Sequence, residues 1–241
     1  MQLITITGGR TLHGRIRPAA AKNSVLPLLA ATLLCRTPSR LRAVPPLADV
    51  ATSLALLQSV GAKAERQGSD LFVAPGQDLQ GEIPDYLAGA MRSSVFYLAP
   101  LLCRVGEVRL PLPGGCKLGP RPVDIHLAGL AAMGAQVELE GIAVTLRRRG
   151  PLHGVDFALR LPSVGATMTL MMAATQAGGT TILRGAACEP EICDLANFLR
   201  ACGAHITGAG TPVVVILGGN PLQTCALARS LRSRCAWGDK T

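Results

Sequence analysis

The chain is poor in aromatic residues, and this scarcity narrows its function. Of 241 residues only 3% are Phe, Trp or Tyr, which leaves too few rings for a surface that stacks successive nucleic-acid bases. The apolar content of 49% is nevertheless well above that of a disordered chain. A chain of this length can therefore bury a sizeable core of aliphatic side chains without disulfides or metal ions.

The eight cysteines lack the spacing of a zinc site or of a disulfide framework. No Cys-x-x-Cys motif occurs, and the two cysteines closest in sequence are Cys188 and Cys193. Residues 1–10 contain no apolar core of a secretory signal. The longest apolar stretch, 25–35, is too short to span a bilayer. The sequence therefore predicts a cytoplasmic protein with reduced thiols, no metal site and no membrane contact.

Positive charge exceeds negative charge, with a formal net charge of +9. Basic runs such as 147–149 are short and carry no interleaved aromatic residues. We interpret them as solvated faces, so no nucleic-acid partner is expected, although a polyanion-binding protein remains an alternative. The excess charge fits an anionic small substrate better.

One six-residue pattern, Leu-x-x-x-Gly-Ala, occurs three times along the chain. Its glycines, Gly61, Gly134 and Gly203, are 73 and 69 residues apart. Each pattern follows an amphipathic stretch and precedes two short alternating runs. We interpret each glycine as the left-handed C-terminal cap of a surface helix that leads into a β-hairpin.

Each repeat also begins with a segment that is apolar on nearly all sides, which is typical of a fully buried helix. These segments are 26–34, 95–103 and 167–175, followed by predicted strands at 40–44, 107–112 and 180–183. Three such units predict an α/β fold of pseudo-threefold, inside-out architecture, with three βαβαββ-type repeats around buried helices and sheets facing outward. We place this domain at 22–219, with a strand at 3–7 before it and an unpacked tail at 220–241 after it.

Polar residues stand where each buried helix is expected to begin. They are Lys22 and Asn23 in the first repeat, Arg92 in the second, and Ser163 in the third. Helix N-termini expose unpaired N–H groups and positive potential, so the threefold symmetry would gather these residues into one anion site. Taken singly, each is more simply explained as a helix cap or a solvated charge.

The loop before the second surface helix is richer in glycine and proline than its two counterparts. It carries Cys116 together with Lys117 and Arg121. A thiol among cations has a lowered pKa and can act as an acid or a nucleophile, whereas the alternative is a structural turn with an incidental thiol. We expect Asp124 to cap the following helix, and His126 to bind a ligand or simply to pack.

Five segments together resemble the enolpyruvyl transferase family, in particular its branch that acts on UDP-N-acetylglucosamine. The segments are 20–27, 91–94, 112–126, 162–167 and 189–192, and they occur in the family's order. The loop with Cys116 is specific to this branch, and the shikimate-pathway branch lacks it. The resemblance covers about 3–218.

The resemblance implies that the enolpyruvyl group of phosphoenolpyruvate is transferred to the 3′-hydroxyl of UDP-N-acetylglucosamine, in peptidoglycan precursor synthesis, without a metal or organic cofactor. It implies that Cys116 is the general acid and that Lys22 and Arg121 hold the phosphate and carboxylate. The residues implied to contact substrate are Lys22, Asn23, Arg92, Arg121, Pro122, Val123, Asp124, Ile125, His126, Ser163, Val164 and Gly165.

The sequence departs from the family in two respects. Ala20 stands where the family usually has glycine at a position of close approach. The family is about twice as long, and segment 1–21 there joins a second domain that this sequence does not match. We therefore expect a truncated half that is nearly inactive alone and that is completed by a separate C-terminal half or by self-association. The alternative is a non-catalytic module that binds a UDP-sugar or regulates a partner.

Overall fold

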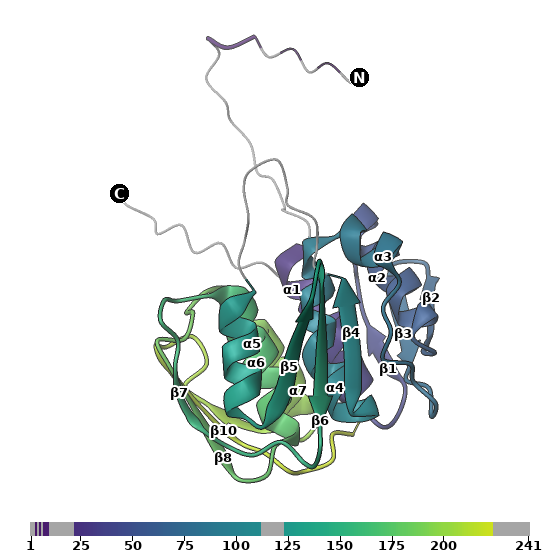
Figure 1. Ribbon diagram of the computed structural model, residues 1–241. Coiled ribbons are helices and arrows are strands. Elements are labelled where there is room, and N and C mark those ends of the chain that lie inside the picture. Colours follow the sequence, from purple (N-terminus) through teal and green to yellow (C-terminus); the bar gives the residue numbers. More distant parts are fainter. Residues whose placement is uncertain (1–2, 4, 6, 10–21, 112–122, 224–241) are drawn as a thin grey trace.

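The computed structural model describes residues 3, 5, 7–9, 22–111 and 123–223. Buried helical segments occupy the centre of the molecule (Figure 1). They are α1 (Lys22–Ala31) with the short 3₁₀ helix η1 (Thr32–Leu34), then η2 (Arg92–Tyr97) with α4 (Leu98–Val105), and finally α6 (Val164–Gln176). Every residue of 24–35 is buried, as expected for a helix that is apolar on all sides.

Each buried helix is followed by a strand, a surface helix and a hairpin, and this unit occurs three times. The first unit has β1 (Ser39–Leu41), α2 (Ala48–Ser59), β2 (Lys63–Gln67) and β3 (Asp70–Ala74). The second has β4 (Glu107–Pro111), α5 (Asp124–Ala132), β5 (Ala135–Glu140) and β6 (Ala143–Arg148). The third has β8 (Thr180–Arg184), α7 (Pro190–Ala201), β9 (His205–Thr207) and β10 (Val213–Leu217).

The three sheets share one strand order. They read β1-β3-β2, β4-β6-β5 and β8-β10-β9, so the last strand of each unit lies in the middle and is antiparallel to both neighbours. In the second sheet Leu146 faces both Val108 and Val137, which places a row of apolar side chains toward the helices. The inside-out architecture and its pseudo-threefold repetition are therefore confirmed.

The three repeated glycines end the surface helices as the sequence predicts. Gly61, Gly134 and Gly203 have φ angles of 94°, 102° and 103°. This left-handed conformation costs little for glycine but strains residues that carry a Cβ. Each glycine therefore allows the chain to leave its helix directly into the hairpin.

The structure departs from the prediction at several short elements. The helix of the second unit begins as the 3₁₀ helix η2, and both α3 (Asp85–Ala90) and β7 (Asp156–Ala158) are additional. Strand β7 lies parallel to β8 at the edge of the third sheet. Within the predicted strand at 3–7, the described residues Leu3, Thr5 and Thr7 are exposed and lie outside any strand.

The packed domain extends further along the chain than the predicted boundary at residue 219. Leu222 is only 1% exposed, forms an isolated parallel bridge with Cys35, and accepts a hydrogen bond of 3.1 Å from the Arg36 backbone N–H. This apolar side chain packs on the core, which extends the described domain to residue 223, whereas 224–241 lie outside the described residues. Among the described helices, none has the length and apolar character needed to cross a bilayer.

Candidate active site

The buried helical segments begin at one cavity of about 950 Å³. Lys22 is the first residue of α1, Arg92 is the first residue of η2, and Ser163 directly precedes α6. The structure brings together every predicted site residue that it describes. The predicted residues lining the cavity are Lys22, Asn23, Arg92, Val123, Asp124, Ile125, His126, Ser163, Val164 and Gly165. Cys116, Arg121 and Pro122 lie outside the described residues.

Ser163 is the N-cap of α6. Its backbone is extended, and its Oγ accepts a hydrogen bond of 3.3 Å from the Ala166 backbone N–H. A serine at this position satisfies one of the N–H groups that a helix leaves unpaired in its first turn. Val164 and Gly165, at the positive end of the helix dipole of α6, also line the cavity.

The start of α1 is held by acidic residues from two surface helices. Lys22 Nζ lies 2.6 Å from Asp49 Oδ2, at the start of α2. Asn23 Nδ2 donates to Glu191 Oε1 of α7 over 3.5 Å. These contacts fix the first two residues of α1 against elements that follow them by many residues in sequence.

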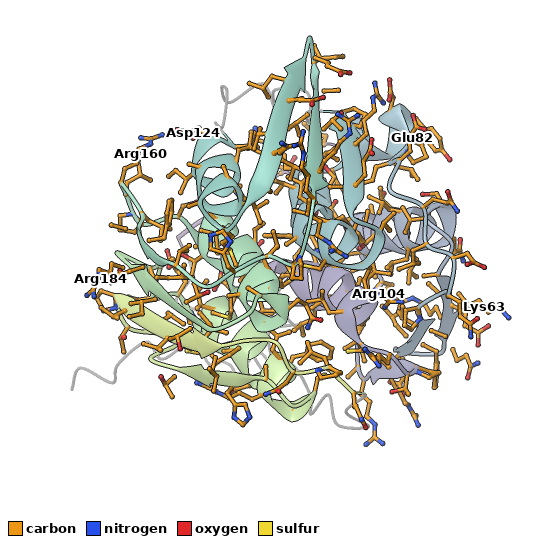
Figure 2. All side chains as sticks on the ribbon, turned by 60° about the horizontal axis from the view of Figure 1, so that its bottom comes forward. Lys63, Glu82, Arg104, Asp124, Arg160 and Arg184 are labelled. Carbon is orange, nitrogen blue, oxygen red and sulfur yellow. The ribbon has the colours of Figure 1, made fainter. Side chains whose placement is uncertain are left out.

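Asp124 pairs with Arg160 instead of capping its helix. The Nη2 and Nε atoms of Arg160 donate to Asp124 Oδ2 over 2.6 and 3.1 Å, and Figure 2 shows the two side chains next to each other. The guanidinium holds the pKa of the Asp124 carboxyl below its usual range. Helix α5 has Val123 as its N-cap, without a side-chain hydrogen bond, so the predicted capping role of Asp124 is wrong.

His126 is buried against the start of α6. Its side chain is 6% exposed, and neither ring nitrogen makes a hydrogen bond within the part of the chain that the structure describes. Burial lowers the pKa of the imidazole to about 4, against weaker opposing effects of the Val123 carbonyl and the Asp124 carboxylate. A Cβ on Gly165 would lie 2.8 Å from His126 Nε2, so glycine permits this close packing.

A second group in the cavity is also without a partner. The Oγ atom of Ser93 is buried and makes no hydrogen bond to any described residue. Buried polar groups normally have a partner, so His126 and Ser93 are suited to a ligand or to ordered water. Among the described residues, no three metal-binding side chains cluster together.

The sequence reasoning did not assign Asp49, Arg160 or Glu191 to the site, although all three line the cavity. A signal for two of them was present. Asp49 and Glu191 begin surface helices at positions equivalent to that of Asp124, so the threefold symmetry that groups the cations also groups these carboxylates. Arg160 precedes α6 within an irregular segment and has no counterpart in the repeat pattern.

Comparison with known proteins identifies the family. The sequence profile described as EPSP synthase (3-phosphoshikimate 1-carboxyvinyltransferase) matches residues 6–228. The chain belongs to the EPSP synthase family. This membership confirms the resemblance to the enolpyruvyl transferases that the sequence motifs indicate.

Similar members of the EPSP synthase family carry one functional name. The chain is 45% identical over 226 residues to UDP-N-acetylglucosamine 1-carboxyvinyltransferase of Cellvibrio japonicus, covering 93% of this chain and 54% of that protein. It is 48% identical over 225 residues to the enzyme of the same name from Oleidesulfovibrio alaskensis, covering 93% and 54%. The chain thus spans about half the length of these relatives.

Solved structures of an enolpyruvyl transferase and of an EPSP synthase share the fold. The enolpyruvyl transferase NikO from Streptomyces tendae superposes with a TM-score of 0.77 at 24% identity, over 90% of this chain and 51% of NikO. EPSP synthase from Acinetobacter baumannii gives a TM-score of 0.70 at 18% identity, over 88% of this chain and 48% of that one.

Proposed function

We propose that this chain supplies the UDP-sugar-binding part of a UDP-N-acetylglucosamine 1-carboxyvinyltransferase. The observation that supports this proposal most directly is that the three buried helical segments begin at the same cavity, with Lys22, Arg92 and Ser163 at their starts. Relatives with that enzyme's name, at 45% and 48% identity, support the choice of substrate.

The cavity offers both kinds of contact that a sugar nucleotide needs. The helix starts and the side chains of Arg92 and Arg160 suit the diphosphate, because N–H groups and cations stabilise anionic oxygens. The Asp49 and Glu191 carboxylates can accept hydrogen bonds from sugar hydroxyls. Apolar side chains on the same wall suit the base and the acetyl group. They are Leu26, Met91, Val95, Phe96, Ile125, Leu161 and Met168.

The proposed reaction proceeds by addition and elimination. The 3′-hydroxyl gives up its proton to a base and its oxygen bonds to the carbon of phosphoenolpyruvate that bears the phosphate, while an acid delivers a proton to the adjacent methylene carbon. Loss of phosphate and of a proton from the new methyl group then restores the double bond. Cys116 is the proposed acid, and Lys22 and Arg121 are the proposed partners of the phosphate and carboxylate. For Cys116 and Arg121 this assignment is supported by the sequence motif alone.

Calorimetric titration with UDP-N-acetylglucosamine tests the proposal. We expect saturable binding that Arg92→Gln weakens by tenfold or more, since a charge-assisted hydrogen bond to phosphate contributes about 1.5–3 kcal/mol. The control is Arg184→Gln, whose side chain pairs with Asp156 outside the cavity. Equal loss in both variants, or no binding at millimolar ligand, would refute the proposal.

Turnover separates a transferase from a binding module. Phosphate release from phosphoenolpyruvate is measured with UDP-N-acetylglucosamine present, for the chain alone and after mixing with the second half of a relative. Release that depends on both substrates and on Cys116 supports a transferase. Sugar-nucleotide binding without release under either condition supports a non-catalytic module.

A further inference from the structure

Acidic residues at the starts of the three surface helices line the same cavity as its cations. Asp49 is the second residue of α2, Asp124 is the first of α5, and Glu191 is the second of α7. All three line the cavity, as do Lys22, Arg92 and Arg160. The described lining therefore carries as many carboxylates as cations, with His126 neutral near pH 7 because its pKa is about 4.

The pair of Lys22 and Asp49 bears directly on anion binding. Their charged atoms are 2.6 Å apart, and the side chains are 50% and 32% exposed. Arg92, by comparison, makes no ion pair with the described residues. The charge of Lys22 is therefore already matched by a carboxylate in the same cavity wall, and an anion that approaches Lys22 also approaches Asp49.

We propose that Asp49 is a positioning residue that holds the Lys22 ammonium group against the cavity wall and competes with anionic ligands for it. The inference rests on the proposed function for its choice of an anionic ligand. A ligand phosphate that engages Lys22 must displace or share the Asp49 carboxylate, so this carboxylate sets how strongly the cavity attracts anions. The same geometry keeps Lys22 oriented in the absence of ligand.

A purely structural role for Asp49 predicts something different. An acidic residue in the first turn of α2 also stabilises that helix through its dipole. Replacement by asparagine would then lower stability and leave anion affinity unchanged. The decisive quantity is therefore the affinity for an anion, measured beside the stability of each variant.

The experiment is titration of the full chain with inorganic phosphate, followed by calorimetry or by phosphorus NMR. Asp49→Asn is expected to bind phosphate at least about fivefold more tightly than the original chain. The repulsion between two unit negative charges 4 Å apart lowers a binding constant by about this factor even in bulk water. Asp49→Glu keeps the carboxylate and should retain the original affinity. Adding Lys22→Met to Asp49→Asn should abolish the gain.

Asp70→Asn is the matched control. Asp70 also lies 2.6 Å from a cation, Arg40, but this pair is outside the cavity. Asp70→Asn removes the same negative charge from the molecule as Asp49→Asn. Unchanged phosphate affinity in Asp70→Asn therefore excludes an effect of net charge. Phosphate affinity of Asp49→Asn that is equal to or below that of the original chain would overturn the proposal. The proposal would also be overturned if the gain persisted when Lys22→Met is added to Asp49→Asn. It would be overturned as well if neither the original chain nor Asp49→Asn bound phosphate.

Titration of the original chain with UDP-N-acetylglucosamine separates this proposal from the proposed function. A phosphate gain in Asp49→Asn without any UDP-sugar binding would leave the role of Asp49 standing and contradict the proposed function. UDP-sugar binding without the phosphate gain would support the proposed function and contradict the proposed role of Asp49.

Discussion

Acidification should protonate His126 only well below the usual range of histidine, because its ring is buried beside the cavity. The pKa falls from 6.5 to about 4 with burial as the main cause, so the unfolded chain binds a proton at this residue more readily than the folded one. The histidine contribution to the free energy of unfolding is complete above pH 6.5 and is lost as the pH falls toward 4. Between about pH 7.5 and about pH 5 the expected loss is roughly 2 kcal/mol.

Two measurements check this value. In NMR spectra of histidine-labelled protein, the ring resonances of His126 should stay in the neutral form down to about pH 5. Urea unfolding at the two pH values should show a smaller drop in stability for His126→Gln than for the original chain. Titration of His126 near pH 6.5 would refute the reasoning, since a ring that protonates there is not desolvated by burial.

Two further predictions concern packing. Gly129→Ala should lower the free energy of unfolding by about 1–3 kcal/mol, because the new Cβ would lie 2.4 Å from both terminal methyl groups of Leu170. Gly89→Ala, whose Cβ meets nothing within 4 Å, should cost nothing in the same urea titration, and an equal loss in both variants would contradict the argument. The sulfur atoms of Cys35 and Cys202 lie 3.7 Å apart, so hydrogen peroxide should join them, with loss of one hydrogen from each thiol and formation of two waters. Peptide mapping should find this disulfide and a mass loss of two hydrogens, and the absence of both after oxidation of the folded chain would contradict the geometry.

The repeat pattern made most of the fold predictable. Gly61, Gly134 and Gly203 recur at nearly constant spacing because each repeat needs the same left-handed turn, and their φ angles confirm that reading. Strand β7 has only three residues and no buried position, so no hydrophobic period indicates it. Leu222 is a single apolar residue in a polar stretch, and its burial depends on contact with Cys35, far away in sequence.

The sequence predicts two of the three described cations of the cavity, Lys22 and Arg92, but not the ion pair that Lys22 forms. Lys22, Arg92 and Ser163 were grouped because they share a position at helix starts, and the structure places all three on one cavity. The ion pair of Lys22 could not be found in the same way, since the repeat places Asp49 at the start of α2 without indicating which cation it contacts. The distance between Asp49 and Lys22 is set by the packing of α1 against α2. The spacing of apolar residues along the sequence predicts the helices but not this packing.

Mapping the binding of UDP-N-acetylglucosamine onto backbone amides by NMR tests the central claim most directly, because it locates the ligand even when affinity is low. If the sugar nucleotide binds in this cavity, the largest shift changes occur at the helix starts, at Asn23, Arg92 and 163–165. Changes centred instead on the outer strands, such as β10, would contradict the claim, as would no change at saturating ligand.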